Sequence, residues 1–451
     1  MVQRSGAANS TKLAIGCGAG FASDRLDAAV ELVERVALDW LVLECLGERT
    51  LAFAHRDRRA DPRRGYDPLL ERRMRALLPR CRARGTRLLS NMGAANPLAA
   101  AEATVAIART LGLAGLKVAV LLGDEVTDLL APDTPLHEGG TVGARGTLVG
   151  ANAYLGCEAL LPAIESGAEV ILTGRVADPS LFLAPMLARF GWALDDWQRL
   201  AAGTVVGHLL ECGMQVSGGY FADPGKKDVP DLARCGFPWA EVSEAGEAIL
   251  SKTPGSGGLV NARTVAEQLF YEVHDPTSYL TPDVVADFST VRIEEIGADR
   301  VRVAGARGAP RPATLKVTVG FDGGFLAEAE ISYAGPNAAP RARLARSVLE
   351  ERMRRVHGFA GPLRIDLVGL RSLHATALPE PAEAEDVRLR AALRAPERET
   401  GELLLWEVEA LLTCGPAGGG GYRGRIVPQV TTASASLPRE RVRTRVEVFE
   451  A

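Results

Sequence analysis

The sequence lacks an excess of positive charge. Its 52 lysine and arginine residues are outnumbered by 56 aspartate and glutamate residues, so the formal net charge is −4. Proteins that bind nucleic acids usually present a broad basic surface. Arginines do cluster at residues 56–64 and 72–87, but acidic and apolar residues interleave with them, as on a solvated helix face. We therefore expect no nucleic-acid partner.

The sequence also lacks long apolar runs. None approaches the roughly 20 residues that a membrane-spanning helix needs, and the polar residues 1–12 do not resemble a secretion signal. The seven cysteines are scattered without C-x-x-C pairs, which excludes a zinc or disulfide framework and suits reduced thiols. These absences predict a soluble, cytoplasmic protein with no membrane partner and no metal centre.

Two common catalytic motifs are missing: the G-x-S-x-G elbow of serine hydrolases and the lysine motif of the P-loop. Gly16, Gly18 and Gly20 come close to a dinucleotide fingerprint, but Phe21 stands where the third glycine of G-x-G-x-x-G belongs. Backbone amides of such a loop can still face an anion. We expect these glycines to bind the anionic end of a substrate, with a simple strand-to-helix turn as the alternative.

What the chain does contain is a regular alternation of strands and helices in its first half. Apolar strands are predicted at residues 12–16, 40–46, 86–91, 116–122 and 169–174. Helices are predicted at residues 24–36, 68–84, 97–111 and 151–166. This alternation is typical of parallel βαβ units.

From about residue 285 the pattern changes to runs of strands, at residues 291–295, 300–304, 314–320 and 325–333. Asp322-Gly323-Gly324 predicts a hairpin between the last two of these strands, and helices follow at residues 341–356 and 401–412. With 451 residues, two domains are expected. The fold class is predicted as α/β: a parallel βαβ domain over residues 12–284 and an α+β domain on an antiparallel sheet over residues 285–451, with a glycine-rich loop at 415–421.

Charged residues gather where the predicted strands end, and ligands bind at that edge of a parallel sheet. Glu44, Glu48 and Arg49 follow the second strand; a carboxylate there can exchange a proton and an arginine can hold an anion. A structural Glu–Arg pair is the alternative. Arg175, after the fifth strand, is the preferred anion anchor, and Asp178 either joins it or caps the next helix.

Further candidates have polar side chains near these strand ends. Asn91 and Thr173 are expected to hydrogen-bond a developing oxyanion, beside Gly174. His208 and Glu211 are three residues apart and share a face if they lie in a helix, which leaves a metal site as the alternative, one residue short of H-x-x-E-H. Glu211 is expected to contribute, with Tyr220, to a polar loop over the site.

Several stretches together resemble the acyclic terpene utilisation protein A family, from about residue 12 to residue 425. The stretches that carry the resemblance are residues 16–25 (GCGAGFASDR), 44–50 (ECLGERT), 65–68 (GYDP), 90–97 (SNMGAANP), 172–180 (LTGRVADPS), 203–212 (GTVVGHLLEC), 218–225 (GGYFADPG), 254–258 (PGSGG), 274–276 (HDP) and 415–421 (GPAGGGG). The resemblance implies a place in the degradation of branched terpenoids such as citronellol and geraniol, through acyl-CoA thioesters. A hydratase or carbon–carbon lyase step is the activity that it suggests.

The leading hypothesis is a lyase or hydratase that acts on a branched acyl-CoA or a related carboxylic substrate, by acid/base chemistry and without a cofactor. Glu44 or Glu48 would exchange the proton, and Arg175 would hold the anionic end. The substrate is a small molecule, and a homo-oligomer is expected. An NAD(P)-dependent oxidoreductase and a non-catalytic pathway scaffold are the alternatives.

Overall fold

The computed structural model describes residues 12–373 and 384–451, which belong to two compact units. The first unit comprises the chain up to Gly320 together with Thr432–Ala451, and the second comprises Phe321–Thr431. This division differs from the domain boundary expected near residue 285. The reason is that strands β11 (Arg292–Gly297) and β12 (Arg300–Ala304) extend the large sheet of the first unit.

The first unit is built on a ten-stranded mixed sheet. From one edge to the other its strands are β11, β12, β8 (Ala248–Lys252), β7 (Pro238–Ser243), β1 (Lys12–Ala19), β2 (Trp40–Leu43), β3 (Arg87–Ser90), β6 (Val170–Thr173), β4 (Lys117–Leu122) and β18 (Arg445–Glu450). The central strands β1, β2, β3, β6 and β4 pair in parallel, as the strand–helix alternation predicts. The flanking strands pair antiparallel.

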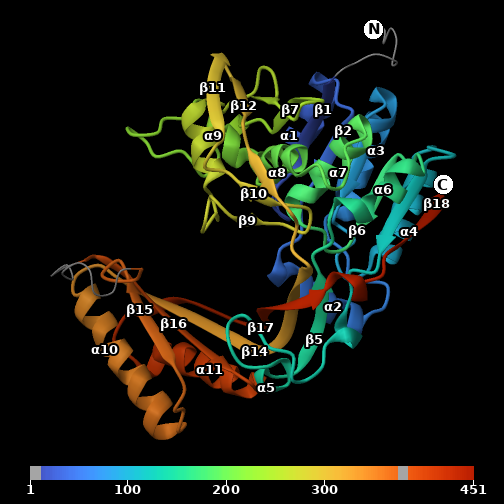
Figure 1. Cartoon of the computed structure of the whole chain (residues 1–451). Coiled ribbons are helices and arrows are strands. Elements are labelled where there is room, and N and C mark those ends of the chain that lie inside the picture. Colours follow the sequence, from blue (N-terminus) through green and yellow to red (C-terminus); the bar gives the residue numbers. More distant parts are fainter. Residues whose placement is uncertain (1–11, 374–383) are drawn as a thin grey trace. The chain divides into compact units, whose positions relative to one another are not determined.

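Helices lie on both faces of this sheet (Figure 1). Helices α1 (Leu26–Arg35), α3 (Leu70–Arg84) and α4 (Pro97–Thr110) cover one face, where Leu32, Leu77 and Val105 join a core with Leu41 and Leu172 of the strands. Helices α6 (Cys157–Glu165), α7 (Asp178–Phe190) and α8 (Trp197–Glu211) pack together, and α7 and α8 contact the central strands. The carboxyl ends of the five parallel strands consequently meet at one edge.

Shorter elements complete the first unit. They are α2 (Glu48–Ala60), α5 (Val142–Arg145), β5 (Leu148–Ala153) and α9 (Ala262–Leu269), with a small sheet of β9 (Tyr279–Leu280), β10 (Val285–Asp287) and β13 (Arg307–Ala309). Among the helices of residues 12–373 and 384–451, none is long and apolar enough to cross a membrane.

The predicted helix at residues 151–166 is wrong in its first half. Residues up to Ala153 form the strand β5, and the helix α6 begins only at Cys157. Strand β5 is held by a partner distant in the sequence, β14 (Thr314–Ala334), so local periodicity could not reveal it.

The predicted hairpin at Asp322-Gly323-Gly324 is also wrong, because β14 continues through it without reversing. Gly324 has a φ of 66°, and its amide donates to Asp322 Oδ1 at 2.9 Å. The left-handed glycine accommodates a local irregularity in the strand. Beyond this point β14 pairs with β16 (Asp386–Ala395) from Phe325 onward.

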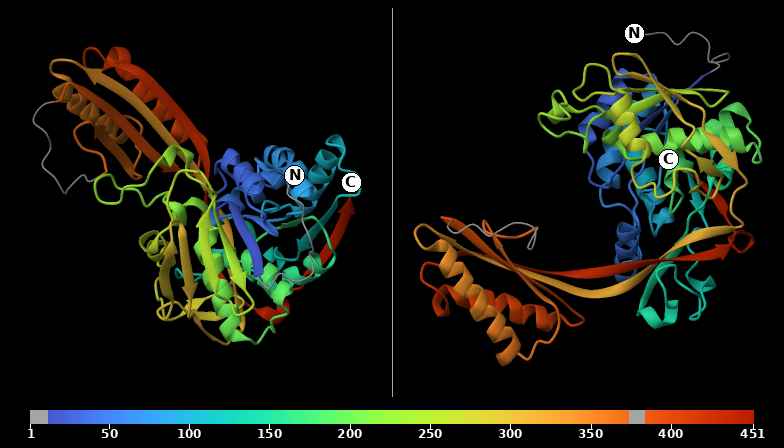
Figure 2. Two further views of the ribbon diagram at one scale, coloured as in Figure 1. Left: turned by 90° about the horizontal axis from the view of Figure 1, so that it is seen from above. Right: turned by 60° about the vertical axis from the view of Figure 1, so that its left-hand side comes forward.

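The second unit is an antiparallel sheet of β15 (Leu363–Val368), β16, β14 and β17 (Gly420–Pro438), with helices α10 (Ala338–Glu351) and α11 (Arg398–Cys414) (Figure 2). Both helices pack on β16, and Leu349 and Leu404 of the helices share a core with Ile331 and Leu389 of the strands. Residues 415–419 join α11 to β17, so the glycine-rich segment is a loop that leads into a strand.

Helix α11 offers a matched test of this core. Leu404 is fully buried, whereas Leu412, two turns later, is 44% exposed. Leu404→Ala should lower the free energy of unfolding of the second unit by about 2–5 kcal/mol, because it leaves a cavity. Leu412→Ala should change it by less than about 0.5 kcal/mol. Hydrogen exchange of the α10 and α11 amides in urea measures both; equal losses would contradict the described packing.

Candidate active site

A cavity of about 1150 Å³ lies at the carboxyl edge of the parallel strands, and all its lining residues belong to the first unit. Residues within two positions of the ends of β1, β2 and β6 line it, including Gly20, Glu44 and Arg175. Asp178 at the start of α7 and Glu211 at the end of α8 also line it. The structure therefore brings together charged residues that are distant in the sequence.

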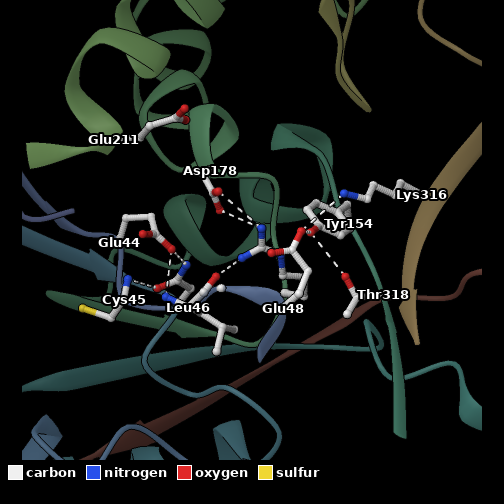
Figure 3. Close-up of polar contacts among 12 residues, drawn as sticks. Glu44, Cys45, Leu46, Glu48, Tyr154, Asp178, Glu211, Lys316 and Thr318 are labelled. Carbon is white, nitrogen blue, oxygen red and sulfur yellow. Dashed lines mark hydrogen bonds and ion pairs between the residues drawn. The ribbon is translucent and has the colours of Figure 1, made fainter. Parts of the chain in front are cut away.

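Arg175 is the buried cation of this cavity, with only 2% of its surface exposed. Its Nη1 donates to the Leu46 carbonyl, and its Nη2 lies 3.2 Å from Asp178 Oδ1 (Figure 3). The guanidinium stacks 4.2 Å from the centre of the Tyr154 ring. Its backbone amide donates to Asp124 Oδ2 at 2.6 Å. Arg175 is thus fixed by groups from several segments, as a buried charge requires.

Glu44 is a buried carboxyl group with hydrogen bonds to one of its two oxygens. Its Oε1 accepts hydrogen bonds from Asn91 Nδ2 and from the Leu46 amide, each at 2.8 Å. Burial raises the pKa of Glu44, although the nearby charge of Arg175 opposes the rise. Asn91 is fully buried and also accepts from the Cys45 amide. Asn91 therefore positions Glu44 and does not line the cavity.

Of the two roles that the sequence left open for Asp178, the structure shows the pairing with Arg175. Asp178 is the first residue of α7, but the N-cap residue is Ala177 and no side-chain capping hydrogen bond is made there. Burial raises the pKa of Asp178 well above its ordinary range, opposed by the charge of Arg175 and reinforced by Glu44. A carboxyl group with a raised pKa keeps its proton to a higher pH than a free aspartate does, and it can release that proton to a substrate.

Glu48 differs from Glu44 and Asp178, because its pKa is lowered. Burial would raise its pKa, but the charge of Arg175 and a hydrogen bond from the Tyr154 hydroxyl outweigh burial and lower the pKa to about 2. Lys316 Nζ lies 3.3 Å from the same carboxylate, and Thr318 Oγ1 donates to the Tyr154 hydroxyl at 3.3 Å. Glu48 is therefore an ionised group and a weak base, which favours Glu44 over Glu48 for proton exchange.

The predicted pair His208 and Glu211 lies on one face of α8, with His208 Nδ1 and Glu211 Oε1 2.8 Å apart. The His208 ring is buried against Tyr279 and Phe288, with both centroid separations 5.3 Å. Glu211 lines the cavity, whereas His208 lies behind it. Among residues 12–373 and 384–451, no three His, Cys, Asp or Glu side chains are arranged to hold a metal ion.

The expected anion loop at Gly16, Gly18 and Gly20 needs correction. Gly16 and Gly18 lie inside β1, where an added Cβ would meet Leu38 at 2.8 Å and Leu41 at 3.0 Å. These two glycines therefore make room for core leucines and do not line the cavity. Gly20 does line it, but its amide donates to Asp24 Oδ2 at 2.8 Å.

Of four other residues predicted for the site, only one lines the cavity. Arg49 is exposed, lies over the Phe53 ring at 5.5 Å and is outside the cavity lining. Thr173 is fully buried and donates to the Gly174 carbonyl at 2.9 Å, so neither residue lines the cavity. Tyr220 does line it and is 83% exposed.

The sequence interpretation missed Tyr154, Lys316 and Asp124. Tyr154 follows β5 and was hidden by the helix predicted there, and Lys316 lies on β14, far from the parallel strands in sequence. Asp124 follows β4 after one glycine, so the strand-end pattern could have found it. Burial raises the pKa of Asp124 to about 6, and its Oδ2 also accepts from Asn152 at 2.8 Å.

The site thus places a buried guanidinium beside two carboxyl groups with raised pKa values, Glu44 and Asp178, which suits acid/base chemistry. The model of a family described as acyclic terpene utilisation family protein AtuA matches residues 13–448. The chain belongs to this family. Membership of the AtuA family implies a role in acyclic terpene utilisation. Comparison with curated proteins and with solved structures gave no match.

The AtuA-family site allows a test of the Arg175 charge. Glu44 and Asp178 have raised pKa values, so the folded state retains protons that the unfolded state has lost, and stability falls as pH rises above about 4. Arg175→Met removes the charge that opposes this rise. Its unfolding free energy should fall more steeply with pH than that of the unmodified protein, by up to about 1.4 kcal/mol per pH unit for each carboxyl group.

The same change at Arg49 is the matched control, because Arg49 is exposed and outside the cavity. Arg49→Met should follow the pH curve of the unmodified protein. Chemical denaturation between pH 4 and pH 8 measures the three curves. Parallel curves for Arg175→Met and Arg49→Met would contradict the assignment of Arg175 as the cation that balances these carboxyl groups.

Proposed function

We propose that this protein is a lyase or hydratase that acts on a branched acyl-CoA or a related carboxylic substrate in terpenoid or secondary metabolism. The observation that carries the proposal is the pair of carboxyl groups with raised pKa, Glu44 and Asp178, both beside the buried Arg175 in one cavity. A proton donor and a proton acceptor with pKa values displaced toward neutral pH are what such a reaction needs.

In the hydratase form, one ionised carboxylate takes a proton from water as the water oxygen bonds to C3 of an unsaturated acyl group. The other carboxyl group gives its proton to C2, so one water molecule is added. In the lyase form, the carboxylate removes the proton of a 3-hydroxyl group, the C2–C3 bond breaks, and C2 receives a proton. Arg175 would stabilise the negative charge that develops on the carbonyl oxygen in both.

Two other functions have less support. A nicotinamide-dependent oxidoreductase was suggested by the glycines after the first strand, but Gly16 and Gly18 pack against core leucines. A non-catalytic scaffold does not require carboxyl groups and a guanidinium to converge on a cavity of about 1150 Å³. Acid/base chemistry uses these features directly, and the absence of a redox cofactor stays a prediction.

Asp178→Asn and Glu44→Gln should each lower kcat by about 10²–10⁴-fold, because each replaces a carboxyl group that transfers a proton in the reaction with an amide that cannot. Each variant should also lose one limb of the pH–rate profile. The measurement follows the absorbance of the conjugated enoyl thioester with branched 3-hydroxyacyl-CoA substrates, and liquid chromatography detects cleavage products. Glu158→Gln is the control, because Glu158 is an exposed carboxylate that pairs with Arg311.

Glu48→Gln should have a smaller effect than either of these changes. Its pKa of about 2 keeps Glu48 ionised throughout the working pH range, so it does not exchange a proton during turnover. We expect kcat to fall less than about tenfold, with both limbs of the pH–rate profile retained. A loss of 10²-fold or more together with a lost limb would move the acid/base role to Glu48.

A further inference from the structure

One end of the cavity is surrounded by large apolar side chains that water reaches. Phe21 is 62% exposed, Leu232 is 40% exposed and Tyr220 is 83% exposed, and all three line the cavity together with Tyr271. These four residues, called the apolar rim below, come from four separate segments of the first unit. Large apolar groups gathered at the mouth of a polar cavity are typical of a ligand-binding site.

The backbone at Tyr220 is held in an unfavourable conformation. Its φ is 60°, in the left-handed region that costs free energy for a bulky residue, and its ring packs edge-on against Tyr271 with centroids 6.1 Å apart. The strain presents an aromatic ring to solvent and contributes nothing to the core. Such strain is common at ligand-binding sites, which gives a second reason to assign a function to the rim.

The rim lies at the Glu211 end of the cavity. An added Cβ on Gly20 would lie 2.4 Å from the Glu211 carbonyl, which places the loop of Phe21 beside the end of α8. Leu232 is next to this loop, because its carbonyl accepts from Arg25 Nη1 at 3.3 Å. Lys316 lies on the opposite side of Asp178 from Glu211 (Figure 3). The rim and Lys316 thus lie toward opposite ends of the cavity, and charged residues such as Asp24 and Glu272 line it close to the rim.

We propose that the apolar rim binds the hydrocarbon chain of the substrate, while the carboxyl-derived end of the substrate lies at Arg175. The identity of that end rests on the proposed function; the assignment of the rim rests on the placement of its four residues. The chain would extend from Arg175 toward solvent past Phe21 and Leu232. Each methylene that the rim removes from water should then tighten binding by up to about fourfold.

Isothermal titration of the full chain tests this assignment. The ligands are carboxylic acids of four, six, eight and ten carbons, and in a second series their CoA thioesters. In the unmodified protein the affinity should rise with each methylene; in the double variant Phe21→Ser/Leu232→Asn this rise should be largely lost, with the four-carbon ligand affected least. Phe270→Ser is the control, because Phe270 is 51% exposed but lies outside the cavity lining.

The outcomes separate the rim assignment from the proposed reaction. If the affinity of the unmodified protein depends on chain length and the double variant loses this dependence, the assignment of the rim is supported, whichever ligand series shows it. The series that shows it identifies the head group of the ligand. Both conclusions hold even if no turnover is found. An unchanged dependence in the double variant, or no binding in either series, overturns the assignment. The assignment is also overturned if light scattering shows that the double variant has a different molecular mass from the unmodified protein while its chain-length dependence is unchanged. The rim would then be a contact between copies of the chain.

Discussion

The buried guanidinium of Arg175 is the constraint on which the rest of the site depends. Removing a full positive charge from water costs several kcal/mol unless opposite charges and hydrogen-bond acceptors surround it. The Leu46 carbonyl after β2, Asp178 on α7 and the Tyr154 ring after β5 all supply such contacts. Segments that are far apart in the sequence are thereby held around one cation. Burial raises the pKa values of Glu44 and Asp178, and the charge of Arg175 opposes this rise without cancelling it.

Two chemically identical side chains near this cation behave differently because of their second partners. Glu48 has the Tyr154 hydroxyl and Lys316 in addition to Arg175, and these fix its ionised form. Glu44 has an amide side chain and a backbone amide as its partners, and its burial dominates. The hydrogen bond from the Tyr154 hydroxyl lowers the pKa of Glu48 more than the charge of Lys316 does, and Glu44 has neither partner. The division of roles in the cavity therefore depends on Tyr154 after β5 and Lys316 on β14, outside the parallel strands.

The sequence was informative where local pattern and strand ends coincide. The apolar runs around β2, β3, β4 and β6 predicted a parallel core, and the charged residues just after β2 and β6 predicted Glu44, Arg175 and Asp178 as neighbours. Local pattern failed where pairing is distant: β5 depends on β14, and Tyr154 and Lys316 entered the site only through that pairing. Glycine was ambiguous too, because the same residue type marks a turn, a left-handed irregularity in a strand or a space for a neighbouring leucine.

The first unit is made from two segments of the chain, interrupted by the whole of the second unit. Strand β18, which pairs with β4, belongs to the later segment. During synthesis on a ribosome, β4 emerges long before β18, so its outer edge has no strand partner until the second unit has been made. An unpaired edge can associate with other chains. Rapid folding of the second unit would therefore shorten the period in which a newly made chain is open to aggregation.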